Sequence, residues 1–278
     1  MMKLLVTTDF SDNSKAAIRF AIQVASQCAA SLTFLHVLHV VRPTAWHEST
    51  YLTYERQEIA KARASLNDFV SRLYNELAAS PADYSCKVKV SPVADYVIMG
   101  YAAEQSVDFI CISTRGAGLL EKIMGTTTAN LINQSTVPVI AVPGNYQPTR
   151  LTSIAYASDL RCLKQEVARV ADFARLLGAS ISLLHVTSPG EPVIEADIID
   201  LAAERSAHLP VDLHLQPADL NQTMIGNIDA AVQQLKPSIV VLFTKQDQGF
   251  FHQLFFSGNA VDYSFSTTTP LLVFAKSQ

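Results

Sequence analysis

The second half of this sequence repeats the order of motifs found in the first half. In both halves an apolar run ends in a hydroxyl residue and an aspartate, a second apolar run carries His-Val, and a third has a proline near its start. Such a repeat predicts two similar domains, because a chain of 278 residues divides into two cores of ordinary size. The matching segments are residues 6–9 and 156–159, 34–37 and 183–186, and 137–141 and 269–273.

The two copies meet at a short segment, residues 143–150, which holds two prolines and a glycine between periodic runs and is typical of a linker. We therefore expect domains at residues 1–145 and 151–278. The second copy is shorter, mostly where the first copy carries a polar stretch at residues 42–53 and a longer second helix.

Strand-like and helix-like patterns alternate within each copy, which predicts an α/β fold. Residues 32–38 and 108–113 are apolar almost throughout, as expected of parallel strands covered by helices on both faces. Residues 84–90 alternate apolar and polar side chains and suit a sheet edge, whereas Pro138 places the last strand at an edge or makes it begin near the proline. The remaining expected strand of the first copy is residues 3–8, and its helices are centred on residues 18–25, 59–77, 94–101 and 129–132.

Composition excludes several classes of protein. Hydrophobic residues make up 49% and charged residues 17%, which excludes intrinsic disorder. A net charge of −4 without a basic run argues against binding to nucleic acid or to an anionic membrane. No apolar run approaches the ~18 residues of a membrane span. The four cysteines are scattered, which favours small buried side chains in a reducing compartment and, with the rest, a cytoplasmic protein.

The segment of residues 113–127 is the best candidate for chemistry. It leaves a buried strand and ends at a helix start, and in open parallel sheets ligands bind at the carboxyl ends of the strands where the strand order reverses. Gly116 and Gly125 allow a close backbone approach, while Thr126 and Thr127 bring hydroxyls and free N–H groups to a helix N-terminus. The segment predicts a phosphate site; the alternative is a solvated loop with a glycine turn.

Together, the repeat, the Thr-Asp-Phe-Ser sequence of residues 8–11, the His-Val pair and this loop resemble the universal stress protein family in its tandem two-domain form. The resemblance implies two repeated doubly wound domains, each with a five-stranded parallel sheet in the order 3-2-1-4-5 and helices on both faces. It also implies that the repeats associate through their last strands as an intramolecular pseudo-dimer. Pairing of whole chains into a homodimer is a further expectation by analogy.

The resemblance implies that the ligand is an adenine nucleotide, ATP or alternatively ADP or AMP. The family's G-x2-G-x9-G-[ST] loop holds phosphates, and an Asp and a Val after the first two strands hold the adenosine part. Here Ser113 replaces the first glycine, and eight residues instead of nine separate Gly116 from Gly125. The candidate binding residues are Thr8, Asp9, Val37, Ser113, Arg115, Gly116, Gly125, Thr126 and Thr127.

The second copy departs further at residues 244–258, which keep the family's length between Asp247 and Ser257 but lack glycine at the motif positions, with Asp247 in the place of Gly116. A carboxylate beside phosphates is unfavourable without a metal between them. We therefore expect no triphosphate in the second domain, although Asp159 and Val186 persist. Its cluster of phenylalanines either fills the vacated site, packs on the first repeat or accompanies a different ligand.

Three functions stay open. The first is a nucleotide-binding sensor of the stress response that is not a catalyst. The second is a slow Mg²⁺-dependent ATPase or self-phosphorylating enzyme, for which no dedicated general base is visible. The third is a ligand-free scaffold whose edge strands recruit partners.

Two groups of side chains carry weaker signals. His36, His39 and His47 could form a metal site, but we expect none, because no carboxylate or cysteine shares their spacing. His36 has a counterpart in His185, which predicts a structural role at the strand end. Aromatic residues of the polar stretch either cover the nucleotide site or contact the other repeat; they are Trp46, Tyr51 and Tyr54.

Overall fold

The computed structural model describes residues 1–80, 83–114, 126–190, 198, 200, 202, 206, 209–244 and 269–275. The described chain divides into two compact units, the first ending at Pro148 and the second beginning at Thr149. The expected association of the repeats through their last strands stays a prediction.

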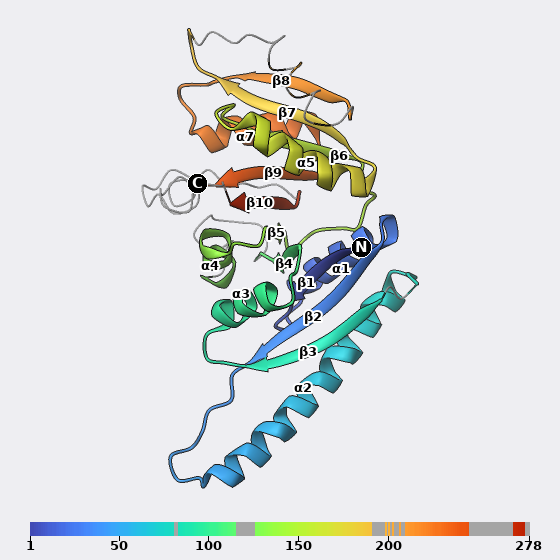
Figure 1. Cartoon of the computed structure of the whole chain (residues 1–278), viewed down its shortest axis with the longest axis vertical. Helices are drawn as coiled ribbons and strands as arrows, with labels where there is room; N and C mark the ends of the chain where they lie inside the picture. Colours follow the sequence, from blue (N-terminus) through green and yellow to red (C-terminus); the bar gives the residue numbers. More distant parts are fainter. Residues whose placement is uncertain are drawn as a thin grey trace. The chain divides into compact units, whose positions relative to one another are not determined.

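The first unit is built on a parallel sheet in the order β3-β2-β1-β4-β5 (Figure 1). This is the order 3-2-1-4-5 that the family resemblance implied, with β3 at an edge as its alternating pattern predicted. The strands are β1 (Met2–Thr7), β2 (Ala30–Leu38), β3 (Tyr84–Val90), β4 (Phe109–Ser113) and β5 (Val139–Val142). The last strand begins directly after Pro138, so the proline is not required to donate to the ladder.

Helices cover both faces of this sheet because its central strands are apolar on both sides. Leu4, Leu5 and Val6 of β1 are at most 1% exposed. On one face lie α1 (Lys15–Gln27) and α2 (Glu48–Glu76), and on the other lie α3 (Ala94–Glu104) and α4 (Thr126–Gln134) (Figure 1). The apolar face of α1, with Ile18, Phe20 and Val24, is fully buried.

The second unit repeats this topology with strands in the order β8-β7-β6-β9-β10. Its strands are β6 (Ser153–Ala157), β7 (Ser180–Thr187), β8 (Val211–Pro217), β9 (Ile239–Thr244) and β10 (Leu271–Ala275), and its described helices are α5 (Leu163–Leu177) and α7 (Met224–Leu235). Gly178 ends α5 in the left-handed conformation, with φ of 65°, which a residue without a Cβ adopts at low cost. The β7–β8 connection, residues 188–210, is shorter than the β2–β3 connection, residues 39–83, as the sequence predicted.

Helix α2 begins earlier than its hydrophobic pattern predicted. The polar stretch was expected to run to residue 53, but the helix starts at Glu48, and its first buried residue is Leu66. The first turns extend beyond the edge strand β3 (Figure 1) and have no core to face, so they carry no hydrophobic periodicity. An acidic residue in the first turn favours a helix start here through the helix dipole.

The cysteines are all free thiols, and only one of them meets the expectation of full burial. Cys111 is buried, whereas Cys28, Cys86 and Cys162 are partly exposed. Burial nevertheless raises the pKa of the Cys86 thiol to about 11, so the thiol is protonated at neutral pH. Within the described residues, no helix combines the length and the apolar character needed to span a membrane.

Candidate functional site

The candidate site lies at the carboxyl ends of β1 and β4. β1 pairs with β2 on one side and with β4 on the other, so the strand order reverses between β1 and β4. The chain leaves β1 into the loop of residues 8–14 and leaves β4 towards residues 115–125. Open parallel sheets bind ligands at such a reversal, because the two connections run to opposite faces and leave a crevice between them.

Hydrogen bonds from its own side chains define the loop after β1. The buried Thr8 accepts the Phe10 N–H at Oγ1 (3.1 Å), and Thr8 Oγ1 also shares a hydrogen bond with Ser14 Oγ (2.8 Å). Ser14 Oγ donates in turn to the Ser11 carbonyl (2.8 Å). Phe10 has φ of 64°, a left-handed conformation that costs a non-glycine residue about 1 kcal/mol and that these bonds hold in place.

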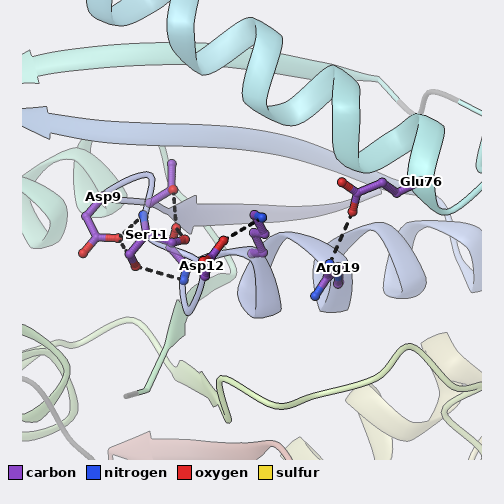
Figure 2. A network of polar contacts seen from close by, with 8 residues as sticks. Asp9, Ser11, Asp12, Arg19 and Glu76 are labelled. Atoms are coloured by element: carbon purple, nitrogen blue, oxygen red, sulfur yellow. Dashed lines mark hydrogen bonds and ion pairs between the residues drawn. The ribbon is translucent and has the colours of Figure 1, made fainter. Parts of the chain in front are cut away.

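Asp9 is the exposed residue at the tip of this loop. Its Oδ1 accepts hydrogen bonds from the Ser11 N–H (3.0 Å) and from the Ser11 hydroxyl (2.6 Å), as Figure 2 shows. Partial burial raises the pKa of the Asp9 carboxyl, but the Ser11 bonds outweigh it and hold the pKa below its ordinary value of 3.8. Asp9 is therefore ionised at neutral pH and can accept hydrogen bonds from a ligand.

Replacing Ser11 with alanine is expected to raise the pKa of Asp9 towards its ordinary value, because the hydroxyl donor to the carboxylate is lost. The stabilisation from this lowered pKa is present above the unfolded value and disappears as the pH falls through the folded value. An NMR titration of the Asp9 carboxyl measures the shift. Ser11→Thr keeps a hydroxyl and is the control; equal pKa values in wild type and Ser11→Ala would contradict the assignment.

His36 fastens the end of β2 to the loop after β1. Its Nδ1 lies 2.9 Å from the Thr8 carbonyl oxygen, which makes it the donor in this bond, and its ring lies 4.3 Å from the ring of Phe10. Phe10 also meets the edge of Phe69 of α2, at 5.7 Å between ring centroids. The structural role predicted for His36 is confirmed. Val37, the next residue, is half-buried near the end of β2.

Ser113, at the end of β4, links the helices on the two faces of the sheet. Its Oγ accepts the Ala17 N–H (2.8 Å), one of the first N–H groups of α1, which have no acceptor within the helix. Its carbonyl oxygen accepts a long hydrogen bond from Thr128 Oγ1 of α4 (3.5 Å). The side chain of this candidate residue thus serves α1, and its main chain meets α4.

The first turn of α4 holds the candidate residues Thr126 and Thr127. Thr126 is exposed and Thr127 is half-buried, and both lie at the end of the helix where its dipole is positive. Asn130 donates a short hydrogen bond through Nδ2 to Asp95 Oδ2 in the first turn of α3. Sequence reasoning missed this pair, since nothing in the spacing of two residues on different helices marks a contact.

Three candidate residues, Arg115, Gly116 and Gly125, lie outside the described residues. The same is true of Asp247 and of the phenylalanines at positions 250–256. The contacts given above join Thr8 to the end of β2 and Ser113 to Thr128 in the first turn of α4, at the carboxyl ends of the strands. That the remaining candidate residues share one site with them stays a prediction.

The second unit rebuilds the loop after its first strand with the same geometry. Ser158 Oγ accepts the Leu160 N–H (3.0 Å), and Leu160 has φ of 61°. Asp159 Oδ1 accepts the Arg161 N–H (3.1 Å), and His185 Nδ1 lies 2.9 Å from the Ser158 carbonyl oxygen. The loops after β1 and β6 therefore share these bonds and the strained residue that follows the aspartate, whereas Arg161 lacks the hydroxyl with which Ser11 donates to Asp9.

The two units differ in what lies beneath these loops. In the second unit the buried Tyr156 donates a short hydrogen bond to the buried Glu166 in the first turn of α5. The corresponding positions of the first unit are the apolar Val6 and Ala16. Burial and the neighbouring Glu166 raise the pKa of the Tyr156 hydroxyl far above its ordinary value.

Two further expectations concern metals and the aromatic residues near α2. In the part of the chain that the structure describes, no three His, Cys, Asp or Glu side chains gather as a set that could hold a metal ion.

The aromatic rings of Trp46 and Tyr54 meet edge to face, with 5.1 Å between their centroids. Both residues line an open hollow of about 410 Å³ along the first turns of α2. Whether these residues cover a ligand or contact the other repeat stays a prediction.

Comparisons with known proteins agree with the fold. The model of the universal stress protein family matches residues 1–143. A universal stress protein from Mycolicibacterium smegmatis is 25% identical over 190 residues, an alignment that covers 66% of this chain and 63% of that protein, less than two thirds of its length. A universal stress protein structure from Archaeoglobus fulgidus has a TM-score of 0.70 at 14% identity and covers 98% of both chains, which shows a shared two-unit fold. Because the family model matches more than half of this chain's residues, the chain belongs to the universal stress protein family.

Proposed function

We propose that this protein binds an adenine nucleotide, ATP or alternatively ADP or AMP, through its first repeat only, and acts as a nucleotide-responsive stress protein. The observation that carries the proposal is that Ser113, at the β1–β4 reversal, bonds both to Ala17 at the start of α1, the helix that follows the Asp9 loop, and to Thr128 in the first turn of α4. The ionised Asp9 carboxylate and the positive end of the α4 dipole suit a ligand with a hydroxyl-rich part and an anionic part.

Seven of the nine candidate residues are proposed to contact the ligand. Thr126 and Thr127 offer N–H groups and hydroxyls to phosphate oxygens at the positive end of α4. Asp9 accepts hydrogen bonds from the hydroxyls of the ribose, and Val37 offers an apolar contact to the adenine. The residues expected to contribute from the phosphate loop itself are Arg115, Gly116 and Gly125.

The second repeat, residues 151–278, is proposed to bind no triphosphate. Its Asp159 loop supports the nucleoside part of a site equally well, but Asp247 places a negative charge in the sequence where the first repeat has Gly116. Like charges cannot share a poorly solvated site at low cost. The first repeat, which keeps Gly116, Gly125 and Thr126 in its sequence, is therefore the proposed nucleotide site.

Titration with labelled ATP is expected to show about one site per chain, and mass spectrometry of the freshly purified protein should detect bound adenine nucleotide. Two equal sites would contradict binding by the first repeat alone. The absence of any binding would favour the ligand-free scaffold. Phosphate release above background with Mg²⁺ present would favour the slow ATPase, so the same protein should be assayed for it.

A further inference from the structure

The linker begins as an ordered turn against the candidate site. The Tyr146 N–H donates to the Pro143 carbonyl oxygen (2.9 Å), which closes a turn over residues 143–146. Just before it, the Thr114 N–H donates to the Val142 carbonyl oxygen (2.7 Å). The segment that leaves β5 is thus tied to the residue from which the chain enters the expected phosphate loop.

Gly144 lies where the turn of residues 143–146 contacts the loop after β1 and the end of β4. A Cβ at this position would lie 2.9 Å from Asn13 Oδ1, in the loop after β1, and 3.2 Å from the Thr114 carbonyl oxygen, at the end of β4. The φ of Gly144 is not positive, so backbone conformation does not require a glycine here. A glycine is required because Asn13 and the Thr114 carbonyl oxygen approach this position too closely for a Cβ atom.

Tyr146 anchors the turn. It is 3% exposed, and its ring meets the edge of Phe20 of α1 at 5.6 Å between centroids. Phe20 itself is fully buried. Because α1 follows directly on the loop that holds Asn13, an edge-to-face contact at Tyr146 keeps the turn, the helix and the loop in one packed group.

We propose that the turn of residues 143–146 is a third wall of the nucleotide site, which positions the Asn13 and Thr114 ends of the two binding loops and couples nucleotide binding to the linker. This inference rests on the proposed function. A ligand that stabilises the positions of Asn13 and Thr114 also stabilises the turn that packs against both, and by reciprocity a change in the turn alters the affinity for the ligand. Gly144 is the positioning residue.

A pair of glycine substitutions tests the proposal. Gly144→Ala should weaken ATP binding about fivefold to tenfold, because Thr114 must shift by a few tenths of an ångström and Asn13 must move aside. Gly100→Ala is the matched control: Gly100 is exposed on α3, a Cβ there meets nothing within 4 Å, and we expect a change in affinity below about twofold. Isothermal calorimetry gives both affinities, and thermal unfolding of each variant confirms that it is folded.

Amide hydrogen exchange supplies a measurement that a loss of stability in the variant would not by itself change. Saturating ATP should slow exchange at the Tyr146 and Thr114 N–H groups more than at the amides of β3, and Gly144→Ala should reduce that difference. Two results would overturn the linker proposal alone, provided that the wild type binds ATP. One is full affinity in both glycine variants, and the other is a turn that gains no protection from exchange. Wild-type protein without any ATP affinity would overturn the proposed function and this inference together.

Discussion

The Gly116→Asp variant should bind ATP about a thousandfold more weakly than the wild type. A carboxylate at this place brings a negative charge to the phosphates, and two unit charges about 4 Å apart near a protein surface repel by about 4 kcal/mol. The second copy already carries this residue type, as Asp247, in the corresponding sequence position. Calorimetric titration measures the loss, and wild-type affinity in Gly116→Asp would exclude the loop as the phosphate site.

The duplicated aspartates provide a matched pair for the same conclusion. Asp9→Ala should lower ATP affinity about tenfold to a hundredfold, because a charge-assisted hydrogen bond to the ligand is removed. Asp159→Ala alters a loop of the same geometry in the second repeat and should change the affinity by less than about twofold. Equal losses in the two variants would indicate two sites, and a loss confined to Asp159→Ala would move the nucleotide to the second repeat.

Tyr156→Phe is expected to lower the free energy of unfolding by about 2–3 kcal/mol. The change removes the hydroxyl that donates to the buried Glu166 carboxyl and leaves that group without this donor. Chemical denaturation followed by circular dichroism measures the change. Tyr96→Phe is the control, because Tyr96 is 74% exposed, and its loss should stay within about 0.5 kcal/mol.

The double variant Tyr156→Phe/Glu166→Leu should recover much of that loss. Replacing both members of a buried polar pair by apolar side chains leaves neither polar group buried without the other, and the first unit already has apolar residues at the corresponding positions. A double variant whose loss equals the sum of the two single losses would show that Tyr156 and Glu166 do not act as a pair.

The same pair predicts the behaviour at high pH. The pKa of Tyr156 is raised in the folded protein by burial and by Glu166, so its contribution to stability is complete below the unfolded pKa of about 10. Above that pH the unfolded chain releases the proton while the folded protein keeps it, and stability falls. Wild type should therefore lose stability more steeply above pH 10 than Tyr156→Phe.

Much of the fold could be predicted from residue patterns, and the rest depended on the family resemblance. Buried strands such as residues 32–38 were recognisable because continuous apolar runs mark coverage on both faces. The strand order came from the resemblance, because periodicity does not say which strands are neighbours. The start of α2 at Glu48 was missed, because exposed turns leave no hydrophobic pattern.

The candidate site was predicted in its residue types but not in its contacts. A hydroxyl, an aspartate and a helix N-terminus at strand ends were readable along the chain. The hydrogen bond between Ser113 and Ala17, and the contact of Gly144 with Asn13 and Thr114, were not. These partners are far apart in sequence, and a Pro- and Gly-containing segment predicts a turn without indicating what the turn packs against.

Local signals along the chain were thus sufficient for the duplication, the α/β class and the chemistry available at the ends of the strands, because each of these depends on residue type and spacing. The link from Ser113 to both helices, the buried Tyr156–Glu166 pair and the turn wedged against two loops appear only once the chain is folded. They arise from close packing between segments that are distant in sequence. There the absence of a Cβ at Gly144, or the presence of a hydroxyl on Tyr156, determines which atoms can come into contact.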